Sequence, residues 1–504
     1  MVDWWMAKKS KPETAERRFA PFFNLVKPRH RPAHPTTMEE REDNFYDDNY
    51  PTHTSHVQLS CQKRCAAQVA TTLLDQESQA LGLLDENNLV RLLRAKHVGY
   101  SQSGLHGLKG YMKVLDASRP WLVYWMLHSL ALLDALPNDD DFLLRVVSTL
   151  SHMFNKSTGG YGGGPQQLAH CAPTYAAVLS LLTVGTPEAY HSIDRGGIYR
   201  FFMSMKQPNG AFTMHQDGEA DTRAAYTVLC IASLLNILTP ELCDQTGAWV
   251  ASCQTFEGGF GAEPFNEAHG GYAFCAVACL YMLDQFSSMD AHALLRWVTL
   301  RQMDEEGGFQ GRTNKLVDSC YSFWQGSIPA ILLHGGLLES ANDEFVAEER
   351  DRMKGLLLMD QERLQQYILQ CCQQTNGGLK DKPGKGRDNY HTCYALSGLS
   401  IAQQYGPTSS MGQDGSASTS GGTSGSASGS ASGKETDTEE KDDGFVFGHP
   451  DNRLEPTHPV YNIRLDKVKD ARAYFYDKDR HLEGGTTHAD LMKPTKREES
   501  DVVL

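Results

Sequence analysis

The sequence of 504 residues lacks any long run of apolar residues. No segment approaches the roughly 20 consecutive apolar residues that a helix needs to cross a bilayer, so we expect no transmembrane segment. The first residues, which include Trp4, Trp5 and several lysines, also lack the continuous apolar stretch of a secretory signal peptide. Pairs of the type Cys-x-x-Cys are missing as well, which excludes a zinc ribbon and a thioredoxin-type motif.

Basic residues are in deficit, since 47 Lys and Arg stand against 62 Asp and Glu, for a formal net charge of −15. A general nucleic-acid-binding protein needs a basic face that displaces counterions from phosphates, so we expect no nucleic-acid partner. The 12 cysteines are scattered, and several, such as Cys230 and Cys279, stand among alanines and other apolar residues. Reduced, buried thiols of this kind are typical of cytoplasmic proteins, and we expect this localisation.

Changes in composition divide the chain into five segments. The polar, proline-containing residues 1–57 are predicted to form a disordered or loosely docked arm, and residues 58–405 the main domain. Residues 406–445 are rich in Ser, Gly and acidic residues, which predicts a flexible insertion. Residues 446–480 regain an ordered pattern, with a short helix expected from Asp466 to Tyr476, and are expected to complete the domain before a polar tail, 481–504.

The main domain contains an internal repeat. Each unit has an amphipathic helix, a glycine-rich turn, a polar stretch and a helix of small apolar residues. The turn glycines, such as Gly210 and Gly258, are expected to end the first helix with a positive φ. A tyrosine of the second helix recurs at intervals of about 50 residues, with a longer interval that indicates an insertion around 339–362. Paired helices with this period predict either an open solenoid or a closed ring of hairpins. The aligned tyrosines are Tyr175, Tyr226, Tyr272, Tyr321 and Tyr394.

The position three residues before each aligned tyrosine is the main candidate for chemistry. It holds Ala172, Arg223, His269, Asp318 and His391. The alignment places this position in the first turn of each second helix, so in a closed ring the five side chains would meet on one rim. Capping alone would explain Asp318 but not arginine or histidine, because Ser, Asp and Asn are the preferred caps. The pattern therefore favours a shared functional rim.

Asp318, Cys320 and His391 together form a candidate zinc site. Carboxylate, thiolate and imidazole are all zinc ligands, and a set of three leaves a fourth position open. An open position suits a thiol substrate, because zinc favours the thiolate form that acts as a nucleophile. Taken singly, Cys320 is more typical of a buried thiol, and His391 of a hydrogen-bonded core histidine. The nearby Cys393 is expected to face the core.

A candidate diphosphate site lies on the same predicted rim. Arg312, Lys315, Tyr321 and His269 supply cationic and hydrogen-bonding side chains. The helix that starts at Gly270-Gly271 is expected to present free backbone N–H groups and the positive end of its dipole. The basic segment 380–387 either contributes to this site or forms a solvated loop.

Aromatic residues in the predicted helices allow two interpretations. Trp121, Trp125, Trp324, Tyr390 and Tyr394 would pack in the core of an ordinary helical protein. In a hollow ring, the same side chains would line an apolar funnel able to hold an isoprenoid.

Several long motifs resemble the β subunits of protein farnesyltransferases, over roughly residues 61–476. They are 119–125, 162–165 with 172–176, 267–272, 307–312, 314–325, 377–379, 381–385, 387–394 and 456–463. The resemblance implies an all-α fold, an α/α barrel (toroid) of repeated helical hairpins that forms an obligate heterodimer with a farnesyltransferase α subunit. It also implies transfer of a farnesyl group from farnesyl diphosphate to the cysteine of C-terminal C-a-a-X motifs, in proteins such as small GTPases.

The resemblance assigns roles to individual residues. It implies one Zn²⁺ held by Asp318, Cys320 and His391, and a Mg²⁺ that assists at the diphosphate near Asp381 and Lys385. The implied farnesyl diphosphate contacts are His269, Gly270, Gly271, Tyr272, Arg312, Lys315, Tyr321, Trp324, Arg223, Tyr226 and Cys275. The implied peptide contacts are Trp121, Trp125, Tyr390, Ala172 and Arg223.

Three positions favour a farnesyl over a geranylgeranyl donor within this resemblance. Bulky Trp121 and Tyr394 are implied to close the pocket to a 20-carbon chain, and Asp381 stands where the geranylgeranyl relative is expected to have lysine. The β subunit of geranylgeranyltransferase type I is the alternative. A terpene cyclase would need an Asp-x-Asp-Asp motif, which the sequence lacks. A non-catalytic helical-repeat scaffold would not need zinc-type residues on one rim.

Overall fold

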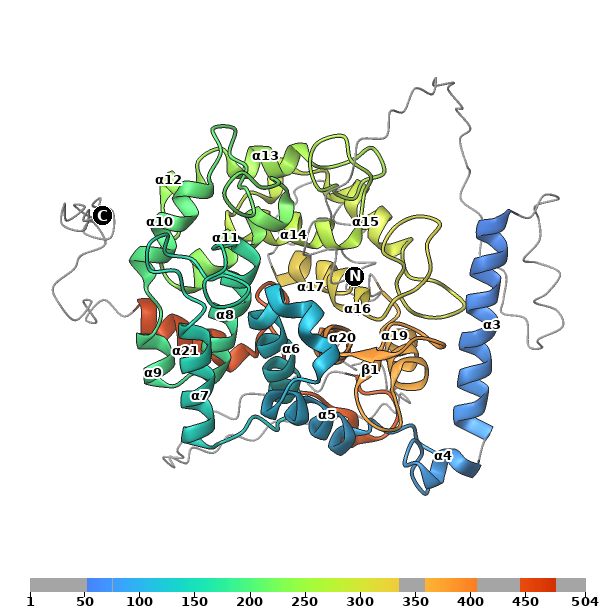
Figure 1. Ribbon diagram of the computed structural model, residues 1–504. Helices are drawn as coiled ribbons and strands as arrows, with labels where there is room; N and C mark the ends of the chain where they lie inside the picture. Colours follow the sequence, from blue (N-terminus) through green and yellow to red (C-terminus); the bar gives the residue numbers. More distant parts are fainter. Residues whose placement is uncertain (1–51, 75, 335–358, 406–444, 477–504) are drawn as a thin grey trace, which may run out of the picture.

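The computed structural model describes residues 52–74, 76–334, 359–405 and 445–476 (Figure 1). Nearly all of the predicted arm, the predicted Ser/Gly insertion, most of the predicted 339–362 insertion and the polar tail lie outside these residues. The first described helix, α3, runs from His53 to Leu74, and the last, α21, from Leu465 to Tyr476. The helix expected from Asp466 to Tyr476 is thereby confirmed.

An inner ring of helices forms the centre of the molecule (Figure 1). Its members are α6 (Arg119–Leu132), α8 (Cys171–Val184), α11 (Thr222–Leu234), α14 (Gly270–Met282), α16 (Tyr321–Trp324) with α17 (Ser327–His334), and α20 (Asn389–Gln404). Each contacts the next along the chain, and α20 contacts α6, which closes the ring. These helices carry small and apolar residues on all sides, and every residue of α8 is buried. The predicted all-α toroid is confirmed.

The outer helices bury only one face. In α7, Phe142, Val146 and Leu150 point inward while charged residues occupy the other side. The outer helices are α5 (Arg94–His106), α7 (Asp140–Ser151), α10 (Arg195–Met205), α13 (Thr246–Ser252), α15 (Ala291–Thr299) and α19 (Gln361–Gln366), which continues into the π-helix η3 (Tyr367–Cys372).

Short elements connect the ring. They are α4 (Gln76–Ala80), α9 (Pro187–His191), α12 (Pro240–Cys243) and the 3₁₀-helices η1 (Gly110–Ser118), η2 (Phe286–Ser288) and η4 (Pro450–Asn452). The strands β1 (Leu379–Lys380) and β2 (Arg387–Asp388) form one antiparallel pair. Among the described residues, no helix is long and apolar enough to cross a bilayer.

The turn glycines have positive φ, as predicted, but they do not end the helices. Helix α10 already ends at Met205, whereas Gly210 lies in a tight turn closed by an antiparallel bridge between Lys206 and Phe212. A Cβ atom on Gly210 would lie 2.4 Å from the carbonyl oxygen of Gln245. Glycine is therefore required by the backbone conformation and by the neighbouring chain, and the expected helix-capping role was wrong.

The segment 456–463 closes one end of the ring from within. The carbonyl oxygen of Asn462 accepts a hydrogen bond of 2.7 Å from the Tyr124 hydroxyl, and that of Val460 accepts one of 2.8 Å from Tyr226. Buried backbone carbonyls need such partners, so the tyrosines of the inner helices hold this segment in place. The opposite end of the inner helices carries their N-termini and the candidate site.

Candidate metal centre and active site

The hydrogen bonds that precede each inner helix define the equivalent rim positions. Ala169, Ala220 and Val317 each form an antiparallel bridge, and Arg387 of β2 is paired in the same way with Lys380 of β1. In the remaining unit, the His269 amide donates to the Phe260 carbonyl just as the Asp318 amide donates to Phe309. The residues that follow these pairs are His170, Asp221, His269, Asp318 and Asp388.

The alignment on tyrosines was therefore wrong for one metal-ligand candidate. The residue equivalent to Asp318 is Asp388, and His391 lies three residues further along α20. The cause is the variable position of the tyrosine, which follows the rim residue by three positions at Tyr321 but by six at Tyr394. Ala172 and Arg223 are likewise displaced by two positions from the rim residues.

Each of the five equivalent side chains caps the start of an inner helix. Asp221 accepts from the Arg223 amide at 2.9 Å, and Asp318 accepts from the Cys320 amide at 3.0 Å. His269 caps through Nδ1, which lies 3.2 Å from the Gly271 amide, although histidine was expected to be a poor cap. The shared role of the rim position is therefore to cap the inner helices, and in some repeats the capping residue also belongs to a candidate ligand-binding or metal-binding group.

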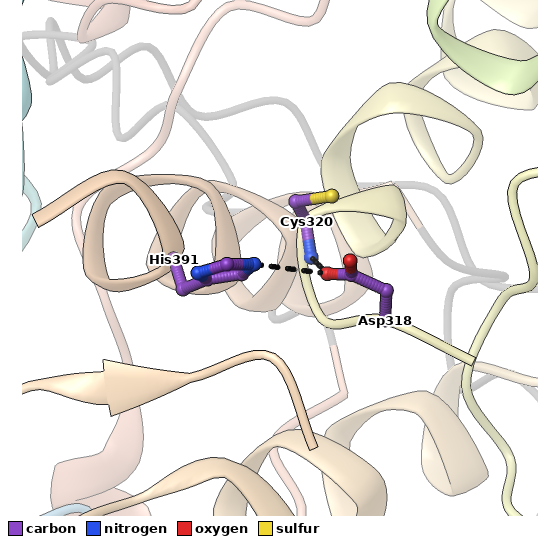
Figure 2. A group of neighbouring side chains, drawn as sticks. All are labelled: Asp318, Cys320 and His391. Atoms are coloured by element: carbon purple, nitrogen blue, oxygen red, sulfur yellow. Dashed lines mark hydrogen bonds and ion pairs between the residues drawn. The ribbon is translucent and has the colours of Figure 1, made fainter. Parts of the chain in front are cut away.

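Asp318, Cys320 and His391 come together at this rim, as predicted. One potential ligand atom from each lies within 4.8 Å of the other two. Figure 2 shows the Asp318 carboxylate between the His391 ring and the backbone nitrogen of Cys320. All three residues are buried, and Cys320 is completely inaccessible to solvent. The packing of α16 against α20 brings residues of successive repeats into one cluster.

Asp388 orients the imidazole of His391. Its Oδ2 atom lies 2.6 Å from Nδ1, which leaves Nε2 facing Asp318. The 3.3 Å contact between Nε2 and the Asp318 carboxylate lacks hydrogen-bond geometry, although Nε2 is buried. A histidine held by a carboxylate at one nitrogen, with the other directed at further donor atoms, is the usual arrangement of a metal ligand.

The electrostatics of the cluster also fit a divalent cation. Burial by itself lowers the pKa of His391, but the adjacent carboxylates of Asp318 and Asp388 outweigh this effect and raise the pKa to about 10. Burial and the charge of Asp318 raise the pKa of the Cys320 thiol well above its usual range. A cation at the centre would reverse both tendencies, because it favours the neutral imidazole and the thiolate. One oxygen, one sulfur and one nitrogen donor fit a zinc ion.

His269 and Tyr321 form a second group on the rim. The Tyr321 hydroxyl lies 3.0 Å from His269 Nε2. Burial, together with the charges of Arg312 and Arg223, lowers the pKa of His269 to about 4, so the ring is neutral at physiological pH. Because Nδ1 accepts the hydrogen bond from the Gly271 amide, the ring proton resides on Nε2, and Nε2–H donates a hydrogen bond to the Tyr321 hydroxyl oxygen. The hydroxyl hydrogen of Tyr321 is therefore available to a ligand.

The start of α14 does not offer the free backbone groups that were expected. The Gly270 amide donates to the Gly311 carbonyl at 2.8 Å, and the Gly271 amide donates to His269. Both groups are satisfied within the protein because the ring brings the preceding turn of the next unit against this helix. Side chains therefore have to supply most of the contacts to an anion here.

The cationic side chains of the rim differ in how they are held. Arg312 pairs with Glu267 at the surface, and its side chain retains 39% exposure. Arg223 is nearly buried, pairs with Asp221 through two nitrogens, and lies over the Tyr272 ring. Arg312 is thus more accessible to an anionic ligand than Arg223.

The charged residues of the segment 380–387 differ in their distance from the candidate site and in their exposure. Lys382 is buried against the Asp381 carboxylate. Burial and the charge of Asp318 raise the pKa of Asp381. The Asp381 carbonyl accepts a hydrogen bond from the Ser319 amide at 3.0 Å, so this residue lies beside the metal-ligand cluster. Lys385 is exposed in a loop, whereas Arg387 binds backbone carbonyls and covers the Tyr100 ring.

A continuous belt of aromatic rings lies inside the helical ring. Trp121 and Trp125 have ring centroids 5.7 Å apart, and Trp125 meets Tyr390 edge-on at 5.6 Å. Trp324 lies 4.3 Å from the Tyr394 ring and donates to the Tyr390 hydroxyl at 3.0 Å. The Tyr390 ring also touches the metal-ligand candidate His391. The belt therefore leads directly to the candidate metal centre.

Sequence reasoning missed several members of this arrangement. Tyr175 packs against Trp121 at 5.5 Å, and its hydroxyl lies 3.1 Å from that of Tyr226. Its alignment with Tyr226 in the repeat was the available signal. Asp388 had no comparable signal, because an Asp-Asn pair before a helix is typical of a simple cap. Cys275 and Cys393 are completely buried, the latter as expected.

Comparisons with known proteins agree with this architecture. Residues 92–463 match the family model of the prenyltransferase alpha-alpha toroid domain. The chain is 40% identical over 405 residues to a protein farnesyltransferase subunit beta of Pisum sativum, which covers 71% of this chain and 89% of the relative. It is 37% identical over 439 residues to that of Arabidopsis thaliana, covering 77% and 83%. The solved structure of Candida albicans protein geranylgeranyltransferase-I complexed with GGPP aligns with a TM-score of 0.56 at 20% identity, covering 76% of this chain and 99% of that one, which supports the fold.

Proposed function

The chain belongs to the prenyltransferase family of α-α toroids, and from this membership we propose that it is the catalytic β subunit of a protein farnesyltransferase. The observation that carries the proposal is the buried cluster of Asp318, Cys320 and His391 at the end of an aromatic belt. The reaction would transfer a farnesyl group from farnesyl diphosphate to the cysteine thiol of a C-terminal C-a-a-X motif.

Zinc would be held by the three clustered side chains. When bound, the ion stabilises the thiolate form of a substrate cysteine at neutral pH. The Asp388 carboxylate keeps His391 in the orientation that a ligand needs. No side chain of the protein has to act as a covalent nucleophile.

The leaving diphosphate would be stabilised by the rim. The substrate sulfur bonds to C1 of the farnesyl group as the C1–oxygen bond breaks, and negative charge accumulates on the diphosphate. The Tyr321 hydroxyl, prepared by its contact with His269, can donate to that charge. The accessible Arg312 and Lys315 lie in the loop beside it, and the same resemblance implies that a lysine of the α subunit completes this group.

The aromatic belt would hold the isoprenoid and the peptide. Its walls are apolar and close-packed, and the Trp121 side chain is only 1% exposed. The proposal assigns Trp121 and Tyr394 to the selection of donor length, with Trp125, Tyr390 and Ala172 beside the peptide. The geranylgeranyltransferase type I alternative is less supported, because the Pisum sativum and Arabidopsis thaliana relatives, at 40% and 37% identity, are both farnesyltransferase β subunits.

A cyclase or a scaffold fits the site less well. The acidic run Asp139–Asp141 lies at the start of α7, where Asp139 accepts from two backbone amides as a helix cap. It therefore has a structural task and lies on an outer helix. A scaffold would have no need for three buried metal-type donors, since burying them without a cation is costly.

The proposed protein acts in the cytoplasm with an α subunit. Co-expression with a candidate α subunit, followed by elemental analysis and transfer assays with both diphosphates, tests the proposal. We expect about one zinc per heterodimer and a preference for farnesyl diphosphate. An active heterodimer without zinc, or one that prefers geranylgeranyl diphosphate, would contradict it.

Replacing Trp121 with threonine is expected to admit geranylgeranyl diphosphate as a donor. The substitution removes an indole that packs against Trp125 and Tyr175, and so opens space inside the belt. The ratio of kcat/KM for geranylgeranyl diphosphate to that for farnesyl diphosphate should rise by at least about tenfold, measured in competition between the two donors. Trp249→Thr on the outer helix α13 is the matched control, and an unchanged ratio at Trp121 would reject the role.

Replacing Asp381 with alanine is expected to raise the magnesium requirement. A carboxylate near the diphosphate is a suitable magnesium ligand, and its loss should increase the half-saturating concentration at least about tenfold. The zinc content should be unchanged. Titration of transfer activity with MgCl₂ measures the effect, and an unaltered magnesium response would remove Asp381 from the proposed site.

A further inference from the structure

The segment 379–381 joins the two parts of the chain that carry the metal-ligand candidates. On one side, β1 pairs with β2, and the Leu379 amide donates to Thr392 of α20 at 2.9 Å. On the other side, Ser319 binds this segment twice. Its amide donates to the Asp381 carbonyl at 3.0 Å, and its hydroxyl donates to the Lys380 carbonyl at 2.9 Å.

Ser319 lies between Asp318 and Cys320, so these contacts control the backbone that presents both ligands. The Ser319 side chain is completely buried. The spacing between the carboxylate, the thiol and the His391 ring thus depends on where the Asp381 carbonyl lies. This dependence concerns the backbone of Asp381 and is separate from any task of its carboxylate.

Tyr367 holds the same carbonyl from the opposite direction. Its hydroxyl donates to the Asp381 carbonyl oxygen at 2.9 Å, and the ring is only 1% exposed. The Cys372 thiol also approaches this oxygen, at 3.8 Å. Tyr367 and Cys372 are the first and last residues of the π-helix η3, a conformation that is rare and often occurs beside functional sites.

The Tyr367 ring supports the ligand pair through a second contact. A Cβ atom on Gly308 would lie 2.6 Å from this ring, so the ring packs directly on the Gly308 backbone. The carbonyl oxygen of the next residue, Phe309, accepts a hydrogen bond of 3.0 Å from the Asp318 amide. One side chain therefore touches both stretches of backbone that hold Asp318 and Ser319.

We propose that Tyr367 is a positioning residue of the metal centre, which acts through the Asp381 carbonyl and Ser319 on the spacing of Asp318 and Cys320. The inference rests on the proposed zinc site but concerns a residue outside it. Metal affinity is sensitive to the groups that orient the ligands, and loss of one typically weakens binding by about 10- to 100-fold.

The test compares Tyr367→Phe with Tyr199→Phe in the heterodimer. Tyr199 is the matched control, because it is also buried and its hydroxyl contacts only an outer-layer residue, Thr239, at 3.0 Å among the described contacts. Zinc affinity is measured by competition with a chromogenic chelator, and ligand geometry by the absorption spectrum of the Co²⁺-substituted protein. Thermal unfolding is recorded for both variants.

We expect Tyr367→Phe to bind zinc about tenfold more weakly and to change the cobalt spectrum, while Tyr199→Phe does neither. Excess zinc should restore part of the lost kcat. An unchanged zinc affinity and cobalt spectrum in Tyr367→Phe would overturn the inference. Equal losses of zinc affinity in both variants, in proportion to their losses of thermal stability, would overturn it as well.

Ser319→Ala provides a second measurement if Tyr367→Phe does not fold. It removes the hydroxyl contact with Lys380 and should also alter the cobalt spectrum, whereas Ser180→Ala, which loses a buried contact within α8, should not. An unaltered spectrum in Ser319→Ala would then reject the positioning role. If the unmodified heterodimer is active and binds no zinc, the proposed function fails first, and that outcome is distinct from a failure confined to these variants.

Discussion

Replacing Cys320 with alanine is expected to abolish zinc retention and to lower kcat/KM for transfer by at least about 10³-fold. The thiol is the sulfur donor of the buried cluster, and its loss leaves only Asp318 and His391. Metal activation of a nucleophile lowers a reaction barrier by several kcal/mol, and a barrier lower by about 4 kcal/mol makes a reaction about a thousandfold faster. Elemental analysis after gel filtration and single-turnover transfer assays measure the two effects.

Cys393→Ala is the control for this prediction. Cys393 is as deeply buried as Cys320 and lies two residues beyond His391, but it is outside the cluster. The control should retain zinc and activity, apart from a modest loss of thermal stability from the smaller side chain. Full zinc content in Cys320→Ala, or equal zinc loss in both variants, would show that the metal does not depend on this thiol.

Replacing Tyr321 with phenylalanine is expected to lower the rate of the chemical step by about 10²- to 10³-fold, with little change in KM. The hydroxyl oxygen accepts a hydrogen bond from Nε2–H of neutral His269, which leaves the hydroxyl hydrogen to be donated toward the ligand side. Removal of one such donor to developing negative charge usually has an effect of this size. Because product release can limit steady-state turnover, single-turnover measurement is required.

Tyr199→Phe again serves as the control, since it removes a buried hydroxyl on the outer layer. Farnesyl diphosphate binding, followed by fluorescence, should be nearly unchanged in Tyr321→Phe, because the donor acts mainly in the transition state. A large loss of binding with an unaffected chemical step would reverse this assignment and make Tyr321 a ground-state contact.

The metal-ligand candidates were predictable because their chemistry depends on residue type. An Asp, a Cys and a His near the starts of repeated helices suggest zinc whatever the exact register. The register itself was misjudged, since tyrosines were taken as equivalent when Tyr394 lies further along its helix than Tyr321. Asp388, the true counterpart of Asp318, became visible only through the pairing of β1 with β2.

The helix starts show a second limit of sequence reasoning. His269 was not expected to cap α14, and the Gly270 and Gly271 amides were expected to be free. Histidine caps here because burial keeps its ring neutral, and burial results from the packing of other repeats around it. The tautomer of His269, and with it the donor role of Tyr321, follows from that environment.

The sequence by itself determined the periodicity of the helical hairpins and the identity of the metal-type donors, because these depend on residue types at local spacings. It left an open solenoid and a closed ring as alternatives, and the all-α toroid was predicted from the family resemblance. Only the tertiary structure decided the approach of His391 to Asp318 and Cys320, the direction of the hydrogen bond between His269 and Tyr321, and the support of Ser319 by Asp381 and Tyr367. These are contacts between segments of different repeats or across a turn of the rim. Their geometry is set when neighbouring repeats pack against one another, and no local pattern of residues encodes it.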